Sequence, residues 1–165
     1  MDMLVGLGIS GVIGAALMSL SLSSARSFAT MANYSEMNAD SRLALDMMAK
    51  EIRNSKGVVE CTTNSITLLD ASTNQFTFEF DEPSRTVTRT DGATKRVMLE
   101  GCDTMKWELF QRTPRGGSYE GYAASRPDLC KLVQVTWVCS RTLFGKRMHT
   151  ETVQSAKVVI RNNED

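Results

Sequence analysis

The chain begins with an apolar stretch, and this stretch most constrains what it can fold into. Between Met3 and Leu22 there is no charged residue, and the only polar ones are three serines. A helix rises 1.5 Å per residue, so about twenty residues cover the roughly 30 Å hydrocarbon core of a membrane. A water-soluble domain has nowhere to bury such a segment on all its faces. We therefore expect a helix that lies in a membrane or in the core of a filament.

A cleavable signal peptide is the alternative interpretation of this stretch. Against it, no basic region precedes the apolar residues, and they run longer than the core of an ordinary signal peptide. No proline or glycine stands between Gly14 and Gly57, which predicts a helix that continues to about residue 56. Such a helix is about 80 Å long at 1.5 Å per residue. A following domain of about 110 residues needs no helix of that length for its own core, so we expect the length to serve something outside the domain.

The predicted helix has two parts of different character. Residues 1–25 are apolar on every face, whereas residues 26–57 are amphipathic. The apolar positions of the second part recur mostly at steps of three or four, at Phe28, Met31, Leu45, Met48 and Ile52. Gly57 is expected to end the helix, and Arg53 and Lys56 suit the negative end of its dipole.

Small residues recur along one side of the apolar part. Gly6, Ser10 and Gly14 follow one another at steps of four, and Gly11 and Ala15 repeat the step beside them. This spacing lets helix backbones approach closely in lipid or in a helical bundle, which predicts helix–helix packing. The alternative is that glycine is simply frequent in membrane helices.

Residues 58–165 predict an antiparallel β domain, so the fold class is α+β, one long N-terminal helix packed on a β-sheet domain. Short alternating segments rich in β-branched and aromatic residues are separated by turn residues. The predicted strands are 65–69, 75–80, 86–89, 96–99, 105–110, 132–139 and 152–160. Three glycines and two prolines make 111–129 a long surface loop and the expected contact region of the domain.

Four cysteines lie downstream of the apolar part, and none forms a CxxC pair. If strand 105–110 pairs antiparallel with 131–138 and residue 110 faces residue 131, then Cys102 faces Cys139, which leaves Cys61 for Cys130. Two disulfides in an oxidising compartment are therefore our interpretation. Buried thiols are the alternative, and a zinc site lacks the usual ligand spacing.

No motif in the sequence indicates catalysis, and we expect no enzyme activity, no cofactor and no metal. Phosphate-binding glycine loops, the HExxH zinc motif and the GxSxG nucleophile motif are all absent from the sequence. His149 is the only histidine, and no motif places a nucleophile beside it. The acidic turn residues Asp81, Glu82, Asp91 and Asp103 lack the spacing of a calcium loop. Lys and Arg together number 19, as do Asp and Glu, and the basic residues are scattered, so no nucleic acid is expected.

Two segments carry a resemblance to a known family. DMLVGLGISGVIGAALMSLSLSSARSF and SRLALDMMAKEIRNSKGV resemble the N-terminal helix of type IV pilins and type II secretion pseudopilins, in the minor-pilin branch of PilW-like and GspJ-like subunits. The resemblance covers residues 1–57, and RVMLEGCDTMKWELF is similar to the family's later strands. It implies a structural subunit, major or minor, of a pilus-like or secretion filament.

The resemblance also implies a location and partners. The helix would span the inner membrane once, with the β domain in the periplasm, before the subunit enters a filament of other pilin or pseudopilin subunits. An assembly platform in the inner membrane and a prepilin peptidase would act on it. The peptidase removes a basic leader ending in glycine, and the new first residue is methylated; neither that glycine nor a basic leader stands before Asp2 in this sequence.

Asp2 occupies the acidic position of the family. The resemblance implies that its carboxylate pairs with the N-terminal amine of a neighbouring subunit and sets the axial register. The alternative is that an acidic residue at a helix N-terminus is favoured by the helix dipole alone.

Topology and compartment give opposite indications. Arg26 follows the apolar stretch and no basic residue precedes it, so the positive-inside rule on these residues would place the β domain in the cytoplasm. The cysteines indicate an oxidising compartment, and a basic leader would reconcile the two. A membrane-anchored periplasmic binding or sensor domain that does not polymerise is the rival function, and a secreted enzyme held by its signal anchor is a third.

Overall fold

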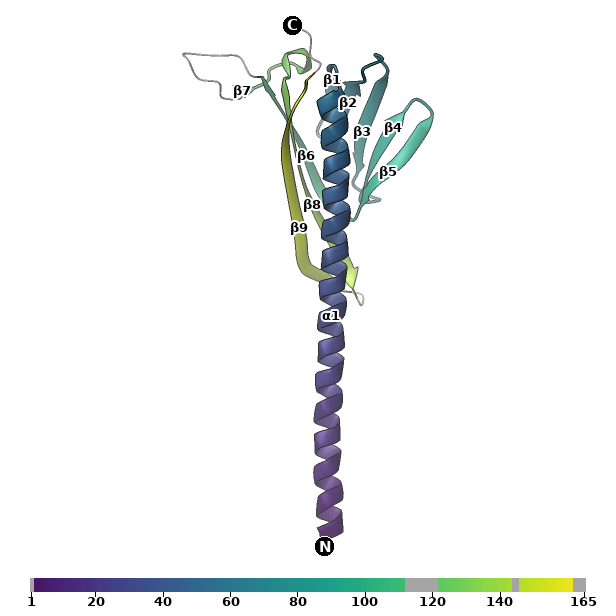
Figure 1. Ribbon diagram of the computed structural model, residues 1–165, viewed down its shortest axis with the longest axis vertical. Helices are drawn as coiled ribbons and strands as arrows, with labels where there is room; N and C mark the ends of the chain where they lie inside the picture. Colours follow the sequence, from purple (N-terminus) through teal and green to yellow (C-terminus); the bar gives the residue numbers. More distant parts are fainter. Residues whose placement is uncertain (1, 112–121, 144–145, 162–165) are drawn as a thin grey trace. The chain divides into compact units, whose positions relative to one another are not determined.

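The computed structural model describes residues 2–111, 122–143 and 146–161 (Figure 1). Helix α1 spans Asp2–Asn54 and is followed by antiparallel strands and one short 3-10 helix, η1 (Pro127–Leu129). The strands are β1 (Gly57–Cys61), β2 (Ser65–Leu69), β3 (Gln75–Asp81), β4 (Thr86–Asp91), β5 (Thr94–Glu100), β6 (Cys102–Gln111), β7 (Tyr122–Ala123), β8 (Leu132–Leu143) and β9 (Lys146–Val159). The fold is α+β, with one long N-terminal helix packed on antiparallel sheets, as the sequence predicts.

The chain divides into two compact units. The N-terminal unit, Met1–Glu36, contributes helix alone, and the C-terminal unit, Met37–Asp165, contains the last turns of α1 and all the strands. The β core therefore needs only the last turns of the helix.

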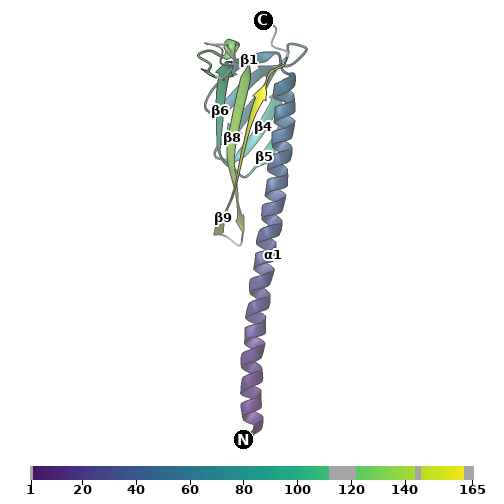
Figure 2. The same ribbon diagram turned by 60° about the vertical axis from the view of Figure 1, so that its left-hand side comes forward.

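The described strands form two sheets. The first sheet has the order β1-β2-β3-β4-β5, and the second has the order β7-β6-β8-β9. Within the second sheet, β6, β8 and β9 run beside one another (Figure 2). The structure contains every strand that the sequence predicts, and most of them are longer than predicted. It also contains β1 and the two-residue β7, which the sequence does not predict.

The core of the C-terminal unit lies between the helix and the two sheets. Met48 and Ile52 of α1 are buried, as are Phe78 of the first sheet and Trp137 of the second. Phe78 stacks on Trp107 with ring centroids 6.3 Å apart, so aromatic side chains join the sheets in one core. The alternating aromatic residues of β3, together with Trp107 of β6 and Trp137 of β8, are thus core residues.

The end of the helix differs from the prediction. α1 ends at Asn54, and Gly57 is the first residue of β1 rather than a helix terminator. Ser55 closes the last turn, because its Oγ donates a 2.7 Å hydrogen bond to the carbonyl of Ile52. The Lys56 amide then donates to the Leu69 carbonyl of β2, which takes the chain directly into the first sheet. A polar side chain, not a glycine, ends this helix.

The register between β6 and β8 differs from the prediction over most of its length, and a β-bulge restores the predicted pairing at Cys102. Phe110 faces Leu132, one residue away from the predicted partner. The register shifts by one between Cys102 and Thr104, with the result that Cys102 faces Cys139. The bulge also changes which face Cys102 presents, because it adds one residue to a strand of period two. Cys102 is therefore buried on the same side as Met105.

Candidate functional site

The N-terminal unit exposes an apolar helix. Every residue from Met3 to Phe28 is exposed within the structure; Leu7 is 74% exposed, Ile13 54% and Phe28 71%. By length and composition, α1 is long and apolar enough to cross a membrane. The amphipathic part predicted for residues 26–57 is exposed at its start, at Phe28 and Met31, and has buried residues from Met37 onward, including Met48 and Ile52. Apolar surface of this extent marks a region that contacts lipid or protein.

The small residues of this helix leave room for a neighbouring backbone. A Cβ atom added at Gly6, Gly11 or Gly14 would have no atom within 4 Å outside the local helix. The hydroxyl of Ser10 donates a 2.8 Å hydrogen bond to the Gly6 carbonyl, so it is satisfied within the helix. Ala15 is exposed like its neighbours. These residues have open space beside them, which fits close approach by a second helix.

Asp2 is the first residue of α1. Its side chain lies outside the described residues, as does most of the loop 111–129 expected to make contacts and the side chain of His149. The register role of Asp2 therefore stays a prediction.

Polar contacts fix the last turns of α1 against the second sheet. Trp137 Nε1 donates to Ser41 Oγ at 2.7 Å, and Gln154 donates to Asn38 at 3.1 Å. Arg141 and Asp40 form an ion pair of 2.9 Å at the exposed edge of this contact. The helix is thereby held in one rotation about its axis.

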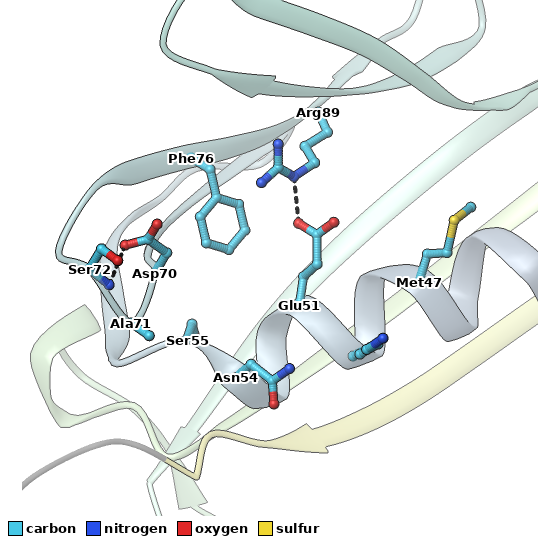
Figure 3. A pocket seen from close by; sticks show the side chains of 10 residues that line it. Met47, Glu51, Asn54, Ser55, Asp70, Ala71, Ser72, Phe76 and Arg89 are labelled. Atoms are coloured by element: carbon cyan, nitrogen blue, oxygen red, sulfur yellow. Dashed lines mark hydrogen bonds and ion pairs between the residues drawn. The ribbon is translucent and has the colours of Figure 1, made fainter.

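A groove of about 440 Å³ lies where the helix end meets the first sheet (Figure 3). Arg89 of β4 and Glu51 of α1 point toward each other across it and form an ion pair. The guanidinium of Arg89 also lies 5.0 Å from the ring centroid of Phe76 and pairs with Asp91. At one end, the Asp70 carboxylate accepts hydrogen bonds from the amides of Ser72 and Asn74. Arg89 thus binds Glu51 and Asp91, whereas Asp70 binds backbone amides. The Arg89–Glu51 ion pair joins the end of the helix to the first sheet.

Of the four acidic residues predicted to lie in turns, only Glu82 does so; Asp81 ends β3, Asp91 ends β4 and Asp103 belongs to β6. The side chains of these three have contacts within the chain. Asp81 accepts a hydrogen bond from Ser84, Asp91 pairs with Arg89, and Asp103 pairs with Arg85 at 2.7 Å. Among the described residues, no group of three or more His, Cys, Asp and Glu is placed to hold a metal ion.

A contact that the sequence did not indicate lies between the two sheets at Arg85. This residue is the last of the turn between β3 and β4 and has a left-handed backbone, with φ of 55°. Its guanidinium donates to the Ser140 carbonyl at 2.6 Å and to the Gly101 carbonyl at 3.1 Å. The Arg85 carbonyl accepts from the amide of Cys102. No local pattern could reveal this, because Ser140 is far away in the sequence.

The four cysteines form two neighbouring pairs of thiols. Cys102 and Cys139 are buried opposite each other on β6 and β8. A hydrogen bond between the two thiols, together with burial, raises the pKa of Cys102 well above its ordinary value, and the same bond lowers the pKa of Cys139. Each thiol of this pair therefore affects the ionisation of the other.

The second pair lies at the other end of β6. Cys61 ends β1, which packs against η1 just before Cys130. Burial raises the pKa of the Cys130 thiol to about 11, and the nearby Cys61 adds to that shift. Burial likewise raises the pKa of Cys61, which is only partly buried. Both thiols therefore stay protonated at neutral pH.

Comparisons with models of known protein families and with curated proteins find no match to this chain.

Proposed function

We propose that this chain is a structural subunit of a type IV pilus-like or type II secretion filament. Its N-terminal helix would anchor it in the inner membrane and then pack with the helices of other subunits. The observation that carries the proposal is the apolar surface of residues 3–22, which is exposed on all sides of the helix. Such a surface is favourable in lipid, and is equally well buried among copies of the same helix.

The resemblance of residues 1–57 to the pilin and pseudopilin helix supports the same proposal. The position of Asp2 and the open glycine side of the helix fit a subunit that is packed at a defined register. The partners would be other pilin or pseudopilin subunits, the assembly platform and the prepilin peptidase. The C-terminal unit would lie in the periplasm and later on the filament, where the environment is oxidising. This function is non-enzymatic.

Cross-linking of the full chain in its own cell tests the proposal. A photoreactive amino acid placed at Ile13 should give adducts with other helical subunits when the filament is assembled, and the chain should resist extraction from membranes by salt. The matched control is the same group at Thr63, an exposed residue of a turn in the C-terminal unit. Thr63 should give few helix adducts.

Two results would contradict the filament proposal in different ways. If Ile13 reacts only with lipid under all conditions, the chain is an anchored domain that does not polymerise, which is the binding or sensor function. If the chain is released from the membrane fraction by salt alone, the apolar helix is not an anchor.

A further inference from the structure

The placement of the four cysteines permits only one way of joining them. Four cysteines have three possible pairings. Cys130 lies beside Phe110, because the next residue, Lys131, donates its amide to the Phe110 carbonyl at 2.9 Å. Cys102 lies eight residues back along β6, about 26 Å away at 3.3 Å per residue. A disulfide needs Cα atoms within about 7 Å, so Cys130 cannot reach Cys102.

The same argument excludes the remaining pairing. Cys139 lies nine residues beyond Cys130 and faces Cys102 along β8, so Cys130 and Cys139 are about 30 Å apart. Residues that face each other in an antiparallel pair have Cα atoms about 4.5–5.5 Å apart, which suits a disulfide between Cys102 and Cys139. The bulge at Asp103 is what places them face to face, since without it the register elsewhere in β6 would set Cys102 opposite Ser140.

We propose that Cys61–Cys130 and Cys102–Cys139 are two disulfide bonds of the mature protein, and that the first joins its two sheets. Cys61 belongs to the first sheet, whereas Cys130 leads into β8 of the second. Arg85 holds the sheets together at the opposite end of β6, next to Cys102. The two sheets are thus joined at both ends of β6. The Cys61–Cys130 disulfide joins them at one end, and the hydrogen bonds of Arg85 join them at the other.

The oxidant is a disulfide, either of a thiol oxidase or of a small molecule such as glutathione. Cys61 is the more exposed member of its pair. Cys61 first loses its proton to a base in solution, and its Sγ then attacks one sulfur of the oxidant, which forms a mixed disulfide and releases the other sulfur as a thiol. Cys130 loses its proton in turn, and its Sγ attacks Sγ of Cys61, which closes the protein disulfide and releases the second thiol. Two electrons pass to the oxidant, and the two protons end on its thiols. Cys102 and Cys139 react in the same way before the core closes over them, because both thiols are buried in the folded chain.

A peptide map without reduction tests the pairing. The full chain in detergent is refolded with oxidised glutathione, alkylated and digested with trypsin. Cleavage after Lys131 separates Cys130 from Cys139, and other basic residues separate the remaining cysteines. We expect two linked peptide pairs, Cys61 with Cys130 and Cys102 with Cys139, each lighter than its two thiol peptides by two hydrogens. The chain isolated directly from its cell should give the same map.

The variants Cys61→Ser and Cys139→Ser make the pairing independent of the wild-type map. In Cys61→Ser, Cys130 should become fully alkylated while Cys102 and Cys139 stay linked, and Cys139→Ser should show the converse. A link between Cys61 and Cys102, or four alkylated thiols after oxidation, would overturn the proposal. If Cys139→Ser does not fold, the peptide maps of the wild type and of Cys61→Ser are sufficient to establish the disulfide pairing. The pairing does not depend on the filament, so its failure would leave the cross-linking result at Ile13 unchanged.

Discussion

Trp137 Nε1 donates a 2.7 Å hydrogen bond to Ser41 Oγ, and both side chains are fully buried. The bond joins the middle of β8 to helix α1 across the core. A serine among apolar helix residues would be costly to bury without a partner. The indole N–H has the same need, so each group satisfies the other, and the helix can pack on the sheet in only one rotation.

Replacing Ser41 by alanine should therefore destabilise the C-terminal unit. The indole N–H would stay buried without its acceptor, which costs about 1–3 kcal/mol. Urea unfolding of the full chain in detergent, followed by tryptophan fluorescence, measures the loss. The control is Ser72→Ala on the exposed turn after β2, which should unfold as wild type does. Equal stability of Ser41→Ala and Ser72→Ala would show that the hydrogen bond contributes nothing.

Arg85 should be the most sensitive charged residue between the sheets. Arg85→Ala removes hydrogen bonds to Gly101 and Ser140 and the ion pair with Asp103, and we expect a loss of about 1–3 kcal/mol. Arg85→Lys should recover only part of this, since an ammonium group lacks the planar fork. Arg96→Ala, on the exposed part of β5, is the control with the same change of charge. If Arg85→Lys is as stable as the wild type, the positive charge accounts for the whole contribution of Arg85 to stability, and the planar guanidinium is not needed.

The reduced protein should lose stability at alkaline pH. The pKa of Cys130 is raised from 9.0 to about 11 in the folded chain. The folded state therefore keeps its proton where the unfolded thiol has lost it, so stability is full below about pH 9 and falls between about pH 9 and 11. Each pKa unit corresponds to about 1.4 kcal/mol, which gives a loss on the order of 3 kcal/mol at most.

Unfolding midpoints of the reduced chain between pH 8 and 11 check this prediction. Cys130→Ser should lose less stability over this range, because its hydroxyl does not titrate there. The oxidised chain should also lose less, because a disulfide carries no proton. Equal alkaline losses in the reduced wild type and Cys130→Ser would refute the assignment to this thiol.

Gly14→Leu should impair helix packing without harming the chain itself. An added side chain has open space at this position, and leucine favours the helix by up to about 1 kcal/mol over glycine. Cross-linking from Ile13 to other subunits should fall several-fold, because the larger side chain keeps a neighbouring backbone away. Ala16→Leu, on the opposite side of the helix, is the matched control. An equal loss of cross-linking in Gly14→Leu and Ala16→Leu would show that a larger side chain on either side of the helix disturbs packing, so that the side with the glycines has no special role.

Asp2→Ala tests the register role implied by the family resemblance. We expect membrane anchoring to be unchanged and incorporation into filaments to fall, with Asp2→Glu restoring part of it. Filament yield from sheared cells, relative to the amount in the membrane, is the measurement. Filaments as abundant as those of the wild type would leave the helix dipole as the only use of Asp2.

Much of the fold follows from local patterns in the sequence. The helix can be predicted from the sequence because no proline or glycine interrupts residues 15–56. Strand β2 can be predicted because it is an alternating segment of five residues with a turn on either side. The end of the helix was placed too late, since Gly57 looks like a terminator when Ser55, which caps the last turn, is overlooked. β1 was missed because its few residues between the helix and a turn show no clear alternation.

The sequence by itself determined the division into an apolar helix and a β domain, because hydrophobicity and strand alternation depend on neighbouring residues alone. Only the tertiary structure decided which distant residues meet. Arg85 reaches Ser140, Trp137 reaches Ser41, and a one-residue bulge at Asp103 turns Cys102 toward Cys139. Such contacts depend on register and on the packing of the two sheets, which are set by the core as a whole, and a shift of one residue would reverse every side chain of a strand.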